Sequence, residues 1–65
     1  MLYDVLICDF LRIHQKICTL DDLIQYIKNE YGSEYDEKRF QFEIEKLINE
    51  RVIRKNKNNV ILLKE

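Results

Sequence analysis

The chain has 65 residues, of which 46% are hydrophobic and 35% are charged, and its formal net charge is -1. Sixty-five residues form one domain with a small core, burying only about 60% of the surface of the unfolded chain, which leaves no room for a sizeable catalytic cleft. A single Gly and no Pro leave few helix breakers, so a mostly helical fold is expected.

The first expected element is an amphipathic helix over residues 2–17. At 100° per residue, one half-circle of this helix collects Leu2, Tyr3, Leu6, Ile7, Phe10, Leu11, Ile13, His14 and Ile17. This face is wide enough to contact two elements, or one element and a partner chain. Asp4, Asp9 and Arg12 interrupt the apolar character, so neither a signal peptide nor a membrane span is expected.

A second helix is expected between Thr19 and Gly32. Thr19 and Asp22 have the spacing of a capping box, and Gly32 suits the position just after a helix end. The apolar residues between them recur at helical spacing: Leu20, Leu23, Ile24, Ile27 and Tyr31.

A third helix is expected over residues 37–50, with Asp36 as its N-cap. Its apolar stripe consists of Phe40, Ile44, Leu47 and Ile48. The period then changes, because residues 52–63 contain two short β-branched runs separated by Lys and Asn, which is typical of a β-hairpin. Ile17 and Cys18 are expected to add a short third strand.

Three helices followed by a hairpin are the element order of a winged helix, in which a helix-turn-helix core leads into a two-stranded wing. The expected fold class is therefore α+β, mainly α, with residues 1–65 forming a single winged-helix domain.

The solvent face of the third helix is a candidate binding surface. Opposite the apolar stripe stand Lys38, Phe42, Glu45, Lys46 and Asn49. Residues 36–51 hold four bases and five acids, and DNA phosphates would repel these acids, so the helix is poorly suited to reading a major groove. An outward-facing Phe42 favours a protein partner, since aromatic residues are enriched at protein interfaces; the alternative is that it packs against the wing or a loop.

The expected wing is basic. It carries Arg51, Arg54, Lys55 and Lys57, with no acid in residues 51–59. These bases would contact an acidic protein patch or a phosphate backbone, or only keep the edge strands from pairing with other chains.

No residue pattern indicates catalysis. His14, expected to be partly buried, has no partner for a triad or a zinc site, and Cys8 and Cys18 form no CxxC pair and are expected to be small apolar fillers. We therefore expect no enzyme, no metal, no cofactor and no small-molecule substrate. The presence of only these two cysteines, with no CxxC pair, also favours an intracellular location, in the nucleus or the cytoplasm.

Three segments together resemble the C-terminal winged-helix domain of cullins: LDDLIQYIKNEYG, YDEKRFQFEIEKLINERVIRK and NVILLKE. The short basic wing is most similar to that of the cullin-like scaffold subunit of the anaphase-promoting complex. The resemblance implies a non-catalytic docking module of a cell-cycle ubiquitin ligase, close to the RING subunit and the ubiquitin-conjugating enzyme, and implies that the chain is the C-terminal part of a larger scaffold. Lys16 lies about a turn from the place of the lysine that cullins modify, near Ile13, and is not assigned as an acceptor.

A second function, the alternative to the docking module, is also compatible with the element order. A small stand-alone DNA-binding regulator, of viral, plasmid or archaeal kind, would dimerise through the wide apolar face of the first helix. It would hold phosphates with the basic wing.

Overall fold

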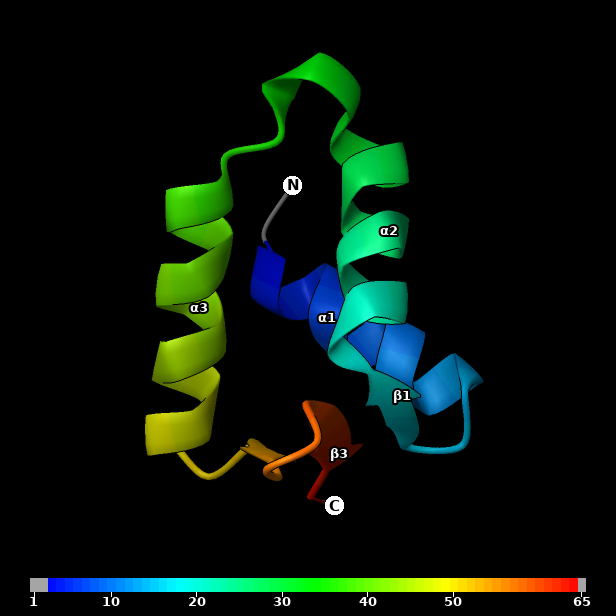
Figure 1. The fold of residues 1–65 in the computed structure, drawn as a ribbon, viewed down its shortest axis with the longest axis vertical. Helices are drawn as coiled ribbons and strands as arrows, with labels where there is room; N and C mark the ends of the chain where they lie inside the picture. The colour runs from blue at the N-terminus through cyan, green and yellow to red at the C-terminus, as the bar shows by residue number, and fades with distance from the viewer. Residues whose placement is uncertain (1–2, 65) are drawn as a thin grey trace.

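The computed structural model describes residues 3–64, which form three helices and a small antiparallel sheet (Figure 1). The α+β class with a mainly helical content is confirmed. In chain order the elements are α1 (Tyr3–Ile13), β1 (Ile17–Thr19), α2 (Leu20–Tyr31), the 3-10 turn η1 (Gly32–Glu34), α3 (Glu37–Asn49), β2 (Ile53–Lys55) and β3 (Val60–Leu63).

The core lies where α1 crosses between α2 and α3 and packs against both (Figure 1). The sheet closes one end of this helical layer. Thirteen buried hydrophobic residues form one cluster that draws on all three helices and on β2 and β3: Tyr3, Leu6, Ile7, Phe10, Leu11, Leu23, Ile27, Phe40, Ile44, Leu47, Ile53, Ile61 and Leu63.

The end of α1 differs from the prediction, because the helix ends at Ile13 and not at Ile17. Gln15 and Lys16 take positive φ values of 61° and 69°, and the Lys16 N–H donates to the Leu11 carbonyl at 2.6 Å. This reversal leads the chain into β1. Ile13 and Ile17, assigned to the buried face, are instead 72% and 49% exposed, and the predicted Leu2 contact lies outside the described residues.

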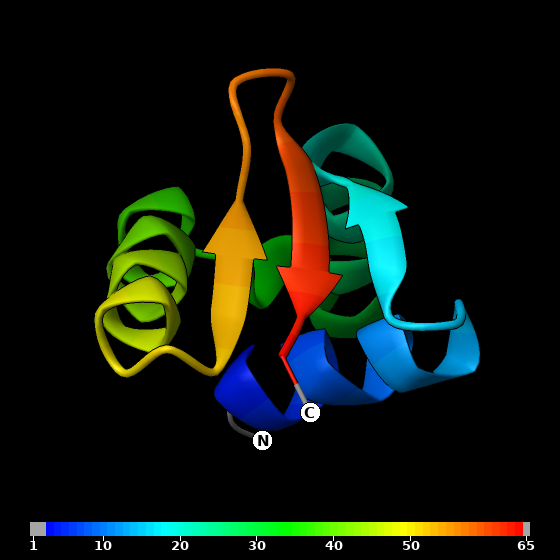
Figure 2. The same cartoon turned by 90° about the horizontal axis from the view of Figure 1, so that it is seen from below.

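The three strands form a sheet with the order β1-β3-β2, so the predicted third strand is confirmed. In Figure 2 the sheet lies in front of the helices, and the turn of the β2–β3 hairpin extends beyond the end of the sheet. The face toward the helices buries Ile53, Ile61 and Leu63.

The hairpin turn depends on asparagine. The Asn56 side chain accepts hydrogen bonds from the Asn58 and Val60 N–H groups at 2.9 and 3.1 Å, and Asn59 takes a φ of 59°. Asn is among the side chains that best tolerate this left-handed conformation. The Asn59 carbonyl also accepts the Leu20 N–H at 2.8 Å, which ties the hairpin to the start of α2.

Both predicted N-caps are confirmed. Thr19 Oγ1 accepts the Asp22 N–H at 3.1 Å, and Asp36 Oδ1 accepts the Arg39 N–H at 3.2 Å. The Asp36 N–H in turn donates to the Tyr3 hydroxyl at 2.9 Å, so the start of α1 is hydrogen-bonded to the cap of α3.

The end of α3 is closed by a motif that usually contains glycine. Arg51 has a φ of 62°, its N–H donates to the Ile48 carbonyl, and the Val52 N–H donates to the Leu47 carbonyl, both at 3.0 Å. These two bonds define a Schellman motif with Arg51 at the left-handed position, where glycine lacks the steric penalty of a Cβ.

Arg51→Gly is therefore expected to stabilise the fold, by about 0.5–1 kcal/mol, because glycine adopts this backbone conformation without strain. Urea denaturation followed by circular dichroism would measure the change. Arg54→Gly is the control, since it places glycine inside β2 and should destabilise. Equal losses in both variants would contradict the left-handed geometry at Arg51.

No helix within residues 3–64 combines the length and the apolar character that crossing a lipid bilayer requires.

Candidate functional site

The outer face of α3 carries the five residues predicted there. All are exposed, and they lie on the opposite side of the helix from the buried Phe40, Ile44 and Leu47. The structure thus brings together, on one helix face, the side chains of Lys38, Phe42, Glu45, Lys46 and Asn49.

Phe42 is the exposed aromatic of this face, with 59% of its surface accessible. This exposure contradicts the alternative in which Phe42 packs against the wing or a loop. Its described ring contact is with a charge, since the Arg39 guanidinium carbon lies 5.8 Å from the ring centroid. That distance allows a cation–π interaction.

Arg39 also pairs with Glu43, a buried acid that the sequence analysis counted among the five acids of residues 36–51. Arg39 Nη2 lies 3.2 Å from Glu43 Oε1, and the Glu43 side chain is only 8% exposed. In the sequence, Glu43 borders the apolar stripe of α3 and lies four residues after Arg39, which is the spacing of an ion pair on a helix. This spacing was the signal that could have indicated the ion pair. Because this carboxylate points inward, the outer face of α3 is less acidic than the sequence count indicated.

The four basic residues of the hairpin region do not share one face. Arg51 stands in the connection between α3 and β2, and Lys57 in the hairpin turn. Arg54 pairs with Leu62 on the outer side of the sheet, whereas Lys55 pairs with Ile61, whose side chain faces the core. These four residues therefore surround the hairpin and do not form a single patch.

The outer side of the sheet carries two aliphatic side chains beside an arginine, a row that was not predicted. Ile17 pairs with Leu62 across β1 and β3, and Leu62 pairs with Arg54 across β3 and β2. Because side chains alternate along a strand, all three residues point away from the helices. Predicting this row from the sequence would have required knowing which residues pair between the strands.

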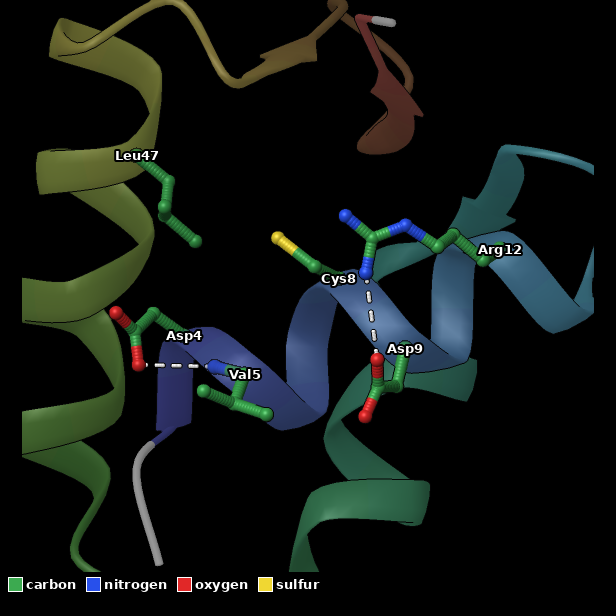
Figure 3. Close-up of a pocket in the computed structure, with 6 residues that line it drawn as sticks. All are labelled: Asp4, Val5, Cys8, Asp9, Arg12 and Leu47. Atoms are coloured by element: carbon green, nitrogen blue, oxygen red, sulfur yellow. Dashed lines mark hydrogen bonds and ion pairs between the residues drawn. The ribbon is translucent and has the colours of Figure 1, made fainter.

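A shallow groove of ≈ 230 Å³ lies between α1 and α3 (Figure 3). Leu47 reaches into it from α3, and the Cys8 sulfur points toward Leu47. An ion pair of 3.3 Å between Arg12 and Asp9 borders it. The lining residues are Asp4, Val5, Cys8, Asp9, Arg12 and Leu47.

The structure shows the surroundings of two residues that were considered for catalysis, His14 and Cys18. His14 is exposed, not partly buried as predicted, and its ring lies 4.2 Å from the Phe10 ring. Burial, with a smaller contribution from Asp22, raises the pKa of Cys18 to about 11, which disfavours the thiolate. Within residues 3–64, no three His, Cys, Asp or Glu side chains gather as a metal site would need.

Cys18 is accordingly expected to react slowly with iodoacetamide at pH 8. A pKa near 11 lowers the thiolate fraction about a hundredfold relative to a free cysteine, and its greater intrinsic nucleophilicity offsets part of this loss, so a rate roughly ten- to a hundredfold lower is expected. Mass spectrometry of the Cys18 peptide would give the rate, with the urea-unfolded chain as control. Equal rates in the folded and unfolded chains would contradict the raised pKa.

Comparison of the chain with protein-family models, with curated proteins and with solved structures gives no match. The function is therefore inferred from the chemistry of these surfaces and from the sequence pattern.

Proposed function

We propose that this chain is a winged-helix protein-interaction module of cullin type, similar to that of the cullin-like scaffold subunit of the anaphase-promoting complex. In this proposal it docks near the RING subunit and the ubiquitin-conjugating enzyme of a ubiquitin ligase, inside the cell, in the nucleus or the cytoplasm. It supplies binding surface only, with no catalytic residue and no cofactor.

The arrangement of the elements supports the winged-helix assignment. The strands follow the order β1-β3-β2, β1 lies between α1 and α2, and the β2–β3 hairpin follows α3 directly. In a winged helix, α2 and α3 would correspond to the helix-turn-helix and the hairpin to the wing.

The observation that carries the choice of a protein partner is Phe42 on the outer face of α3. A phenyl ring with 59% exposure gains free energy only when another apolar group covers it, and large aromatics with arginine are enriched at protein interfaces. Glu45 stands one turn from the ring on the same face, and a carboxylate there would be repelled by a phosphate backbone.

Titration of the ¹⁵N-labelled chain with a ubiquitin-conjugating enzyme tests this proposal. Binding should shift the NMR signals of residues 38–57, and Phe42→Ala should weaken it. Ile13→Ala should have no effect, because Ile13 is also an exposed apolar residue, 72% accessible, but lies at the end of α1. Unchanged spectra at high micromolar concentrations would count against the proposal.

DNA binding remains the second candidate because of two observations. Residues 51–59 hold four bases and no acid, and the Glu43 carboxylate of α3 is buried in an ion pair with Arg39, away from a phosphate backbone. Fluorescence anisotropy with a random duplex at about 50 mM salt would detect phosphate contacts, which weaken steeply as salt rises. No binding at that salt concentration would remove this candidate.

The dimer that was envisaged for such a regulator would find little apolar surface on α1, since Leu6, Ile7, Phe10 and Leu11 are all buried against the other elements. Ile13, which is 72% exposed, is still accessible at the end of the helix. A DNA-binding form that dimerises through α1 would therefore have a smaller contact surface than the sequence pattern indicated.

A further inference from the structure

We infer that the segment docking on α3 is acidic and presents an aliphatic or aromatic side chain to Phe42, with carboxylates on both sides of it. This inference rests on the proposed function, because it names the chemistry of the partner at the same surface. It is derived from the charges around the Phe42 ring.

Cations surround Phe42 along the helix. Lys38 precedes it by four residues, Arg39 by three, and Lys46 follows it by four, and all three are exposed. At these spacings side chains on a helix are direct neighbours. Glu45, three residues after Phe42, is the one acid at such a spacing. Even with the charge of Arg39 balanced by Glu43, Lys38 and Lys46 outnumber Glu45, so a ligand that covers the ring meets a surface with a net positive charge.

Arg39 is held in place for this role. Glu43 anchors one nitrogen of its guanidinium at 3.2 Å, while the side chain of Arg39 remains 57% exposed beside the ring. A guanidinium has five N–H donors in a planar fork, so donors remain for a carboxylate of the partner. Ordering Arg39 in advance lowers the entropy lost when the partner binds.

Other ligand types satisfy only part of this surface. An uncharged apolar segment would cover Phe42 but would remove Lys38, Arg39 and Lys46 from water without a counter-charge, which is unfavourable. A nucleic acid backbone would pair with the cations but offers no apolar group to the ring. A segment that alternates carboxylates with an apolar side chain both covers the Phe42 ring and supplies counter-charges to the cations around it.

Selection from a random peptide display library tests the inference without knowledge of the natural partner. Immobilised chain should enrich peptides in which a Leu, Ile, Val or aromatic residue lies within four positions of at least two acids. A parallel selection on Phe42→Ala, with Ile13→Ala as the matched control, should lose this motif in the first variant and keep it in the second.

Affinities of the enriched peptides then separate charge from apolar contact. Phe42→Ala should weaken binding at least tenfold, and Ile13→Ala less than twofold. Replacing the apolar residue of the peptide with Ser should match the effect of Phe42→Ala, and polyglutamate of the same charge should bind far more weakly. Polyglutamate binding as tightly as the selected peptides would overturn the inference.

The remaining outcomes distinguish this inference from the proposed function. Neutral or basic peptides that shift the NMR signals of α3 would overturn the acidic chemistry and leave the proposed function standing. Peptides that bind another surface, or no enrichment at all, would overturn the inference, whereas the proposed function is decided by the titration with a ubiquitin-conjugating enzyme. Displacement of the peptides by duplex DNA at about 50 mM salt, with tighter binding of the duplex, would favour a phosphate ligand and overturn the inference.

Discussion

Phe40→Ala is expected to lower the free energy of unfolding by about 3–5 kcal/mol, which is enough to unfold much of a domain of this size. Phe40 is 0% exposed, and its ring lies 6.2 Å from that of Tyr3 and 6.0 Å from that of Tyr35. The loss of ring contacts and the cavity left behind both contribute. Urea denaturation monitored by far-UV circular dichroism would measure the difference.

Phe42→Ala, two positions further along the same helix, provides the matched control. Because Phe42 is 59% exposed, the removal of its ring should change the free energy of unfolding by less than about 0.5–1 kcal/mol. Phe40→Leu should fall between the two. Similar losses for Phe40→Ala and Phe42→Ala would show that Phe42 is packed and would also remove the basis of the docking surface.

Gly32→Ala is expected to destabilise the fold by about 1–3 kcal/mol. Gly32 has φ 60° and ψ -132° at the end of α2, a combination that residues with a Cβ rarely adopt. No atom lies within 4 Å of where the Cβ would be, so the loss would come from the backbone conformation and not from a clash. Thermal unfolding of the two proteins would give the difference.

A D-amino acid separates this cause from other effects of a methyl group. In chemically synthesised chain, D-Ala at position 32 should recover most of the loss, because the mirror image of this conformation is close to the polyproline region near about φ -75° and ψ +145°. A D-Ala variant as unstable as the L-Ala variant would contradict the backbone explanation.

Most of the helical framework was predictable because local signals specify it. Thr19 and Asp36 are the N-caps at which α2 and α3 begin, and Gly32 marks the end of α2. The end of α1 was missed because Gln15 and Lys16 take positive φ values without being glycine or asparagine. Only the pairing of β1 with β3, a contact distant in sequence, reveals why the helix must stop there.

The candidate site was predictable from the sequence only where helical periodicity determines which way a side chain points. The outer face of α3 follows from 3.6 residues per turn, whereas the directions of Arg54 and Lys55 depend on strand register. The inward position of Glu43 was missed because acids are seldom buried, and only its ion pair with Arg39 makes that position tolerable.

The aromatic contact between the ends of α1 and α2 has a spectroscopic consequence. The chain has no Trp, and the rings of Tyr3 and Tyr31 stack at 4.3 Å with an interplanar angle of 16°. Two phenols so close in a fixed chiral orientation should couple their transitions and give a strong near-UV circular dichroism band. That band depends on tertiary packing and would disappear in a state that keeps its helices but loses its core. The chain thus contains its own optical reporter for the docking of α1 on α2.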